Sequence, residues 1–266
     1  MLNKNQETFT LTWKFSMPSI RLFVEDDLSF GSVITLSRPQ THYLVNVMRR
    51  RTGDTLLLFN GRDGEWKTEL KKIRRDACDV KVVDFNRKLV IVPDIWLVFA
   101  PIKRGRIDFV AAKSTELGVR VIQPILTDYT AVSRVNEERL RMNAIEAAEQ
   151  CGALTVPTIR STIKLSKLLA DWPAERKLII CDETGTAPPI YKALENTSST
   201  KEWAILVGPE GGFSESEFDQ LRQCVSFIPV SLGPRILRAD TAAIAALTCW
   251  QSVLGDWHSD PKIKQL

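Results

Sequence analysis

Three glycines that lie close together mark the first segment able to do chemistry. Gly208, Gly211 and Gly212 stand in VGPEGGFS, between an apolar stretch and a helical pattern whose N-cap we expect at Ser214. Glycine lets a backbone approach a ligand closely, and open α/β sheets bind ligands at the carboxyl ends of their strands. The spacing fits neither a P-loop nor the G-x-G-x-x-G fingerprint of dinucleotide sites. The segment therefore indicates a different ligand loop, with an ordinary glycine-rich turn as the alternative.

A second segment of similar design follows. SLGPRILRADT, residues 231–241, also predicts a strand end, a tight turn at Gly233 and Pro234, and the start of a helix. Two such loops could meet around one ligand. The helix after it carries alanines at positions 242, 243, 245 and 246. Small side chains permit close approach of backbones, within the fold or across a dimer, and a buried core helix is the alternative interpretation.

The elements that must position these loops alternate along the chain after Leu89. Apolar stretches typical of buried parallel strands exchange with helical patterns, as in a sheet that helices cover on both faces. The expected strands are WLVFA, RVIQPIL, RKLIICD, EWAILVG and VSFIPVSL, and the expected helices are 107–117, 137–150, 214–223 and 239–254. We therefore predict an α/β domain over residues 89–266.

The preceding part of the chain has a different texture. The stretches IRLFV, TLLLFN, EWKTELKKI and ACDVKVVDF predict short strands, separated by turn clusters. One helix is expected from Thr41 to Arg51, and its apolar face would hold Tyr43, Leu44, Val47 and Met48. We predict a small β-barrel over residues 17–88, with residues 1–16 as a loose extension.

Composition excludes several classes of protein. The chain has 266 residues, of which 44% are hydrophobic and 26% charged, so it can bury a sizeable core and is not disordered. Its longest apolar run, 89–102, is interrupted by Pro93 and Asp94 and is too short to span a bilayer. Residues 1–16 lack the apolar core of a signal peptide. We expect no membrane segment and a cytoplasmic protein.

Cysteine and histidine are too sparse and scattered for a metal centre. The five cysteines lie far apart with no C-x-x-C pair, and only two histidines occur. This pattern indicates neither a disulfide framework nor a zinc site, so we expect no metal.

Positive charge is concentrated near the N-terminus. The net charge is +4 overall, and residues 17–88 alone hold 14 Lys or Arg against 10 Asp or Glu. The densest clusters are Arg49 to Arg51 and the run from Lys71 to Arg75. If the fold brings them to one face they could neutralise phosphates of a nucleic acid, and a solvated charged surface is the alternative.

Four sequence motifs occur along the chain in an order that is also found in a known protein family. They are KSTELGV at 113–119, AIEAAEQCGALTVP at 144–157, LVGPEGGF at 206–213 and SLGPRILRADTA at 231–242. In this order and spacing they resemble the bacterial 16S ribosomal RNA uracil-N3 methyltransferases of the SPOUT superfamily. The resemblance extends from Ser19 to about Trp250, because RLF at 21–23, the stretch from His42 to Arg49, Gly53-Asp54 and Asn60-Gly61 match the family's N-terminal domain.

The resemblance implies a fold and a reaction. The fold would be a PUA-like RNA-binding barrel followed by an α/β domain with a deep trefoil knot, although threaded chains are rare in general. S-adenosylmethionine would bind in the knot, and two copies would form a homodimer through this domain. The substrate would be one uridine near the 3′ end of 16S rRNA in the small ribosomal subunit. The chain departs from the family pattern at Ala153, where Arg is common, and at Ala239-Asp240, where Thr-Glu is common.

The resemblance also implies roles for single residues. Arg238 would stabilise charge on a uracil carbonyl oxygen, with a structural ion pair as the alternative. Glu210 would accept the N3 proton, or only hydrogen-bond its own loop. The expected cofactor-binding residues are Leu206, Gly208, Pro209, Glu210, Gly211, Gly212, Leu232, Gly233, Ile236, Leu237, Thr241 and Ala242. The expected RNA-binding residues are Arg21, His42, Arg49, Arg50, Arg51, Lys72, Arg74 and Arg75.

Two other functions compete with methyl transfer. A nicotinamide-dependent oxidoreductase would also contain an α/β domain, but the glycine spacing and the acidic ribose ligand of such enzymes are missing. A non-catalytic RNA-binding protein would keep the basic clusters and would need no glycine loops in the second domain.

Overall fold

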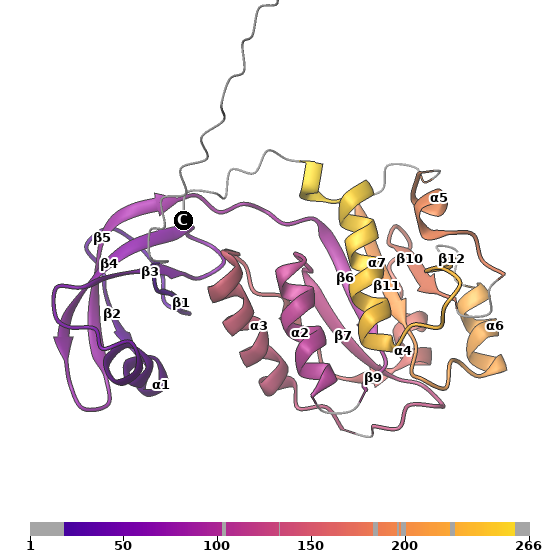
Figure 1. Ribbon diagram of the computed structural model, residues 1–266, viewed down its shortest axis with the longest axis horizontal. Coiled ribbons are helices and arrows are strands. Elements are labelled where there is room, and N and C mark those ends of the chain that lie inside the picture. Colours follow the sequence, from indigo (N-terminus) through magenta and orange to yellow (C-terminus); the bar gives the residue numbers. More distant parts are fainter. Residues whose placement is uncertain are drawn as a thin grey trace, which may run out of the picture.

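The chain forms two β-sheets that lie next to each other along the long axis of the molecule (Figure 1). The computed structural model describes residues 19–102, 105–132, 134–182, 186–195, 197, 201–223 and 227–258. The predicted extension, residues 1–16, lies outside the described residues. A connection over residues 88–93 joins the two sheets.

The N-terminal sheet has five strands in the order β1-β3-β4-β5-β2. Its strands are β1 (Arg21–Phe23), β2 (Val33–Leu36), β3 (Thr55–Phe59), β4 (Glu65–Ile73) and β5 (Cys78–Arg87). All pairs are antiparallel except β1 with β3, which is parallel. Their alternating apolar side chains enclose a small core that includes Leu22, Leu58, Leu70 and Val80. Four of these strands were predicted, and β2 was not.

The helix of this part begins earlier than predicted. Helix α1 (Arg38–His42) starts after Ser37, whose backbone N–H donates to the side chain of Gln40 in a capping box. It continues into the π-helical turn η1 (Tyr43–Val47) and ends before the arginines. The predicted range Thr41 to Arg51 and its apolar face are therefore wrong in part: Leu44 is buried, whereas Val47 and Met48 are exposed.

The C-terminal sheet is entirely parallel, as predicted. Its strand order is β12-β10-β11-β6-β7-β8, and β9 also pairs with β7. The strands are β6 (Asp94–Phe99), β7 (Val121–Leu126), β8 (Thr158–Ile159), β9 (Ile163–Lys164), β10 (Lys177–Cys181), β11 (Glu202–Val207) and β12 (Phe227–Val230). The five predicted strands are confirmed, and β8 and β9 are too short to give a pattern of their own.

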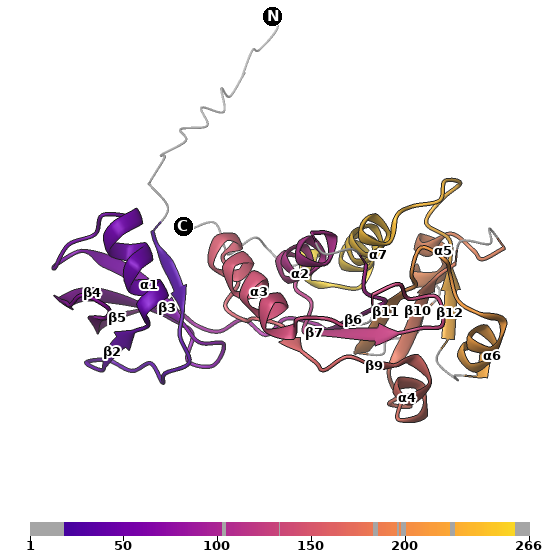
Figure 2. The same ribbon diagram turned by 90° about the horizontal axis from the view of Figure 1, so that it is seen from below.

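Helices cover both faces of this sheet, as Figure 2 shows. One face packs against α2 (Arg106–Glu116), α3 (Glu137–Cys151), α5 (Ile190–Glu195) and α7 (Ala239–Val253). The other packs against α4 (Leu165–Ala170) and α6 (Glu215–Gln223). Successive residues of β6 divide between the two cores, because Leu97 points to the first and Val98 to the second. Within the described part of the chain, no helix is long and apolar enough to cross a membrane.

The chain after β12 runs beside the connection that leaves β10. The backbone N–H of Ser231 donates to the carbonyl oxygen of Pro188 at 2.8 Å, and that of Ile190 donates to the carbonyl oxygen of Ser231 at 3.0 Å. A trefoil knot depends on the path of this and the neighbouring connections, of which residues 183–185, 198–200 and 224–226 lie outside the described residues. The knot stays a prediction implied by the resemblance.

Candidate functional site

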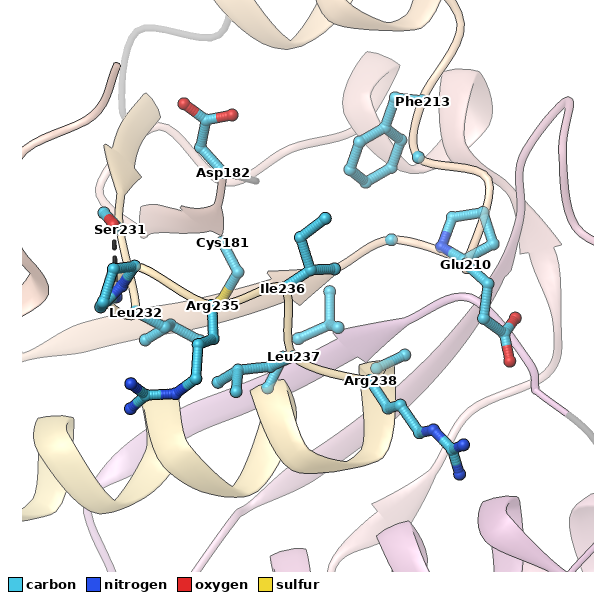
Figure 3. Close-up of a pocket in the computed structure, with 18 of the residues that line it drawn as sticks. Cys181, Asp182, Glu210, Phe213, Ser231, Leu232, Arg235, Ile236, Leu237 and Arg238 are labelled. Carbon is cyan, nitrogen blue, oxygen red and sulfur yellow. Dashed lines mark hydrogen bonds between the residues drawn. The ribbon is translucent and has the colours of Figure 1, made fainter. Parts of the chain in front are cut away.

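A cavity of about 290 Å³ opens at the carboxyl ends of β10, β11 and β12 (Figure 3). Both glycine loops line it, together with the first turn of α7. The predicted residues that it brings together are Gly208, Pro209, Glu210, Gly212, Leu232, Gly233, Ile236, Leu237, Arg238 and Ala242. The two loops therefore meet around one cavity, at the edge where parallel α/β sheets bind ligands.

The first loop is held in place by the start of α6. The backbone N–H of Ser214 donates to the carboxylate of Glu217 at 2.9 Å, and the Ser214 hydroxyl donates to Asp128 at 2.6 Å. Glu217 is buried and also accepts the backbone N–H of Asp128 at 2.9 Å. These bonds fix the loop between β11 and α6 to the loop after β7, so the cavity wall is defined before any ligand binds.

Glycine is required in both loops for different reasons. A Cβ on Gly208 would lie 2.9 Å from the ring of Phe213, so any side chain there would press into the cavity wall. Gly233 has φ of 109°, a backbone conformation that side chains oppose. Its N–H donates to the hydroxyl of Ser231 at 3.3 Å, which closes the turn (Figure 3).

Three predicted cofactor contacts do not line the cavity. Leu206 is fully buried in the core between β11 and the helices α4 and α6. A Cβ on Gly211 would lie 3.1 Å from the side chain of Tyr129. Thr241 is exposed and stands one position before Ala242 on α7. None of the three is among the residues that line the cavity, and their roles as cofactor contacts stay predictions.

The cavity also contains residues that the sequence argument did not single out. Cys181 ends β10 and Asp182 directly follows it, and both line the cavity. Phe213 and Arg235 complete the lining from the two loops. Burial raises the pKa of the Cys181 thiol to about 12, so this side chain is neutral and unreactive. The strand RKLIICD was predicted correctly, and its carboxyl end was the signal that could have identified both residues.

Charged side chains gather at one side of the mouth. Glu210 and Arg238 lie on the same side of the cavity in Figure 3. Arg106, at the start of α2, places Nη1 3.8 Å from Glu210 Oε1 and Nε 3.9 Å from Asp240 Oδ2. Arg238 precedes α7 as its N-cap and forms no ion pair with any described residue. Its guanidinium is therefore available to an anionic group at the mouth.

The predicted basic residues mostly lie on one end of the N-terminal sheet. The backbone of Gly53 donates to the carbonyl oxygen of Leu70 at 2.8 Å, which brings the loop after Arg51 beside the end of β4. His42, Arg49, Arg51, Lys72 and Arg75 are exposed, and Arg50 is half-buried. Among the described residues, Arg49, Arg51, Lys72 and Arg75 have no ion-pair partner, whereas Arg74 is paired with Asp79. Arg49 has φ of 53°, uncommon for a residue with a side chain.

Arg21 is not part of this surface. Its side chain is only 3% exposed and its Nε donates to Glu65 at 2.7 Å. The guanidinium is held inside the junction between the two sheets and cannot reach a nucleic acid. The prediction of Arg21 as an RNA contact is therefore wrong, because the docking of the two parts covers it.

Comparison with known proteins places the chain in a family. The model of an RNA methyltransferase domain matches residues 91–251, and that of an RNA methyltransferase PUA domain matches residues 36–83. A protein named ribosomal RNA small subunit methyltransferase E from Rickettsia conorii is 32% identical over 228 residues, covering 85% of this chain and 93% of its own length. The chain belongs to this RNA methyltransferase family.

Solved structures of family members have the same fold. A ribosomal RNA small subunit methyltransferase E from Neisseria gonorrhoeae, bound to S-adenosylmethionine, is 28% identical with a TM-score of 0.81. A protein from Legionella pneumophila described as a methyltransferase, in complex with the same cofactor, is 29% identical with a TM-score of 0.81. Each covers 90% of this chain and 99% of its own. The predicted PUA-like domain and SPOUT-type α/β domain are both confirmed, and membership of this family argues against the oxidoreductase and the non-catalytic alternatives.

Proposed function

We propose that this chain transfers the methyl group of S-adenosylmethionine to N3 of one uridine near the 3′ end of 16S rRNA, in the small ribosomal subunit. The observation that carries the proposal is the cavity itself: two glycine loops and the start of α7 enclose it in a chain whose relatives are named for small-subunit rRNA methylation. Membership of the family supplies the reaction class, and the geometry supplies the residues.

The cavity residues fit the proposed cofactor. Leu232, Ile236 and Leu237 offer apolar surface to an adenosine, and Ile236 is 83% exposed although it is apolar. The absence of a side chain at Gly208 leaves the room that a Cβ would fill against Phe213. The Asp182 carboxylate can accept hydrogen bonds from ribose hydroxyls or an ammonium group. When bound, S-adenosylmethionine supplies an electrophilic methyl group on its sulfonium.

The residues of this chain must orient the base and manage one proton. The N3–H of neutral uracil is a poor nucleophile, so N3 has to be held in line with the methyl group while its proton leaves. Arg238 lines the cavity, and in this proposal it would donate to a uracil carbonyl oxygen and stabilise the negative charge that develops there. Glu210 is half-exposed beside Arg106, an arrangement that favours a hydrogen-bonding role in its loop over proton acceptance.

The division of the chain supports separate tasks for its two parts. We infer an RNA-binding domain over residues 17–88 and a methyltransferase domain over residues 89–266. In the first, His42, Arg49, Arg50, Arg51, Lys72, Arg74 and Arg75 would contact the RNA backbone, and the unpaired cations among them would neutralise phosphates, which position a nucleic acid without reading its sequence. A homodimer through the second domain, acting in the cytoplasm, would let the basic surface of one copy hold RNA whose uridine enters the cavity of the other.

Two measurements test this proposal in sequence. Isothermal titration with S-adenosylmethionine and with NAD should show binding of the first only. Radiolabelled S-adenosylmethionine should then label purified small subunits that lack the modification, and should label large subunits and transfer RNA far less. Binding of NAD alone, or cofactor binding without label in any RNA, would contradict the proposal.

A further inference from the structure

A buried carboxylate joins the two parts of the chain. Glu65, at the start of β4, is completely buried. Its Oε1 accepts Arg21 Nε at 2.7 Å and its Oε2 accepts Arg87 Nε at 2.8 Å. Asn86 Nδ2 also donates to Oε2 at 2.5 Å. One carboxylate therefore orients two guanidinium groups that leave the N-terminal sheet from different strands, β1 and β5.

Both guanidinium groups then reach across to the end of α3. Arg21 donates to the carbonyl oxygens of Ala148 at 2.7 Å, Glu149 at 3.0 Å and Ala153 at 2.7 Å. Arg87 Nη2 donates to the carbonyl oxygen of Gly152 at 2.7 Å. The last carbonyls of a helix have no partner within it and carry its partial negative charge, so they are natural acceptors for cations.

Further contacts surround this cluster on both sides. The carboxylate of Glu149 accepts the backbone N–H of Phe23 at 2.9 Å, and Arg141 on α3 pairs with Glu25. Phe59 from β3 packs with Ala148 and Leu154 in a small apolar core of its own. The junction therefore has a buried centre and is bonded in several directions, unlike a flexible linker between independent domains.

Such a cluster fixes geometry more than it adds stability. A buried ion pair adds little to stability over an apolar pair of the same volume, because desolvation offsets the attraction. Its directional bonds, however, are satisfied in one arrangement only. The charge of Glu65 is also needed locally, because without it the buried guanidinium of Arg21 and the partly buried guanidinium of Arg87 would have mainly carbonyl oxygens as partners. Rotation of one part against the other would break four bonds at once, two to the last turn of α3 and two to the residues that directly follow it.

We propose that Glu65 is a positioning residue for the methyl-transfer reaction. Acting through Arg21 and Arg87, it locks the RNA-binding surface at a fixed distance and angle from the cofactor cavity, and so determines which nucleotide of a bound RNA reaches the methyl donor. The inference rests on the proposed function. It assigns no contact with RNA or cofactor to Glu65, whose side chain is buried in the junction.

The test compares two equivalent substitutions in one strand. Glu65→Gln removes the buried charge with almost no change in volume. Glu69→Gln makes the same substitution four residues later, at a partly exposed carboxylate that, among the described residues, pairs with Lys71 alone at 2.6 Å. Val33 and Phe109, which are exposed, are each replaced by an unnatural amino acid that carries a spin label, so that the native cysteines stay unlabelled. The distance between the two labels then reports the distance between the two parts of the chain. The same proteins are assayed for kcat on small subunits and for the Kd of S-adenosylmethionine and of the subunit.

If Glu65 positions the two parts of the chain, its substitution must change their distance distribution and kcat together and leave both Kd values almost unchanged. Glu65→Gln should broaden the distance distribution and lower kcat about 100-fold, as misplacement by about 1 Å does in well-oriented reactions, while both Kd values stay within about twofold. Glu69→Gln should behave as the parent. A narrow distribution in Glu65→Gln, an unchanged kcat, or a loss of cofactor affinity equal to the loss of kcat would overturn the proposal.

A milder variant covers the case in which Glu65→Gln does not fold. Arg87→Gln leaves the pair of Arg21 and Glu65 intact and removes only the bonds from Arg87, whose side chain is 25% exposed. The same criteria then apply to it. A parent protein that labels no small subunit would contradict the proposed function and the positioning role together, whereas the distance distribution would still decide whether the junction is rigid.

Discussion

Glu149 gives this protein a stability that should fall as the pH rises. The residue lies in the last turn of α3 and its carboxylate accepts the backbone N–H of Phe23. Burial raises the pKa of Glu149 from the ordinary 4.5 to about 7, although the bond from Phe23 and the charge of Arg21 both act to lower it, and Glu146 adds to the rise. We predict that the free energy of unfolding of the parent falls as Glu149 loses its proton, and that Glu149→Gln abolishes this fall.

The size of the effect follows from the difference between the two pKa values. The folded state holds the Glu149 proton more tightly than the unfolded state, so the stabilising contribution is complete below pH 4.5 and is lost as the pH rises through about 7. The pKa of Glu149 differs between the unfolded and folded states by the step from 4.5 to about 7, and each pKa unit corresponds to about 1.36 kcal/mol. The free energy of unfolding therefore falls by about 3 kcal/mol when the residue is fully ionised. The amide of Gln keeps an oxygen that can accept the Phe23 N–H and has no charge to desolvate.

Urea unfolding of the parent and of Glu149→Gln between pH 4.5 and 8.5 measures this difference. The other titratable groups are common to both proteins, so their contributions cancel in the comparison. The variant should be similar in stability to the parent near pH 4.5 and more stable by about 3 kcal/mol at pH 8.5. A stability difference that does not change with pH would refute the reasoning, and so would a variant that becomes relatively less stable as the pH rises.

Four further predictions concern the cavity, the basic surface and one turn. Arg238→Ala should lower kcat about 100-fold or more while the Kd of S-adenosylmethionine changes little, as expected for a contact made mainly in the transition state. Gly208→Val should abolish cofactor binding in titration calorimetry without unfolding the protein, because its Cβ meets the Phe213 ring at 2.9 Å. The double variant Arg50→Glu and Arg51→Glu should weaken binding to small subunits and flatten its salt dependence, with cofactor affinity unchanged. Gly64→Ala should lower the melting temperature, since φ is 83° there and a Cβ would lie 2.5 Å from the carbonyl oxygen of Arg87.

Elements with strong hydrophobic patterns could be predicted from the sequence. The burial of side chains where the two parts of the chain pack together could not. The parallel strands were recognisable because each is apolar on both faces, and the two loops because glycine ends a strand before a helix. Arg21 and Glu65 alternate with apolar residues in their strands as surface residues do, and only the packing of α3 against the N-terminal sheet buries them. The residue that a Cβ on Gly211 would meet is Tyr129, 82 positions earlier in the chain. No local pattern encodes such contacts.

The position of the transferred methyl group tests the central claim most directly. Purified small subunits that lack the modification are incubated with the protein and labelled S-adenosylmethionine, and the label is located by nuclease mapping and mass spectrometry of the nucleosides. The account predicts N3-methyluridine at one nucleotide near the 3′ end of 16S rRNA. Label on a ribose, on uracil C5 or on transfer RNA would contradict it, even though the protein would still be a methyltransferase.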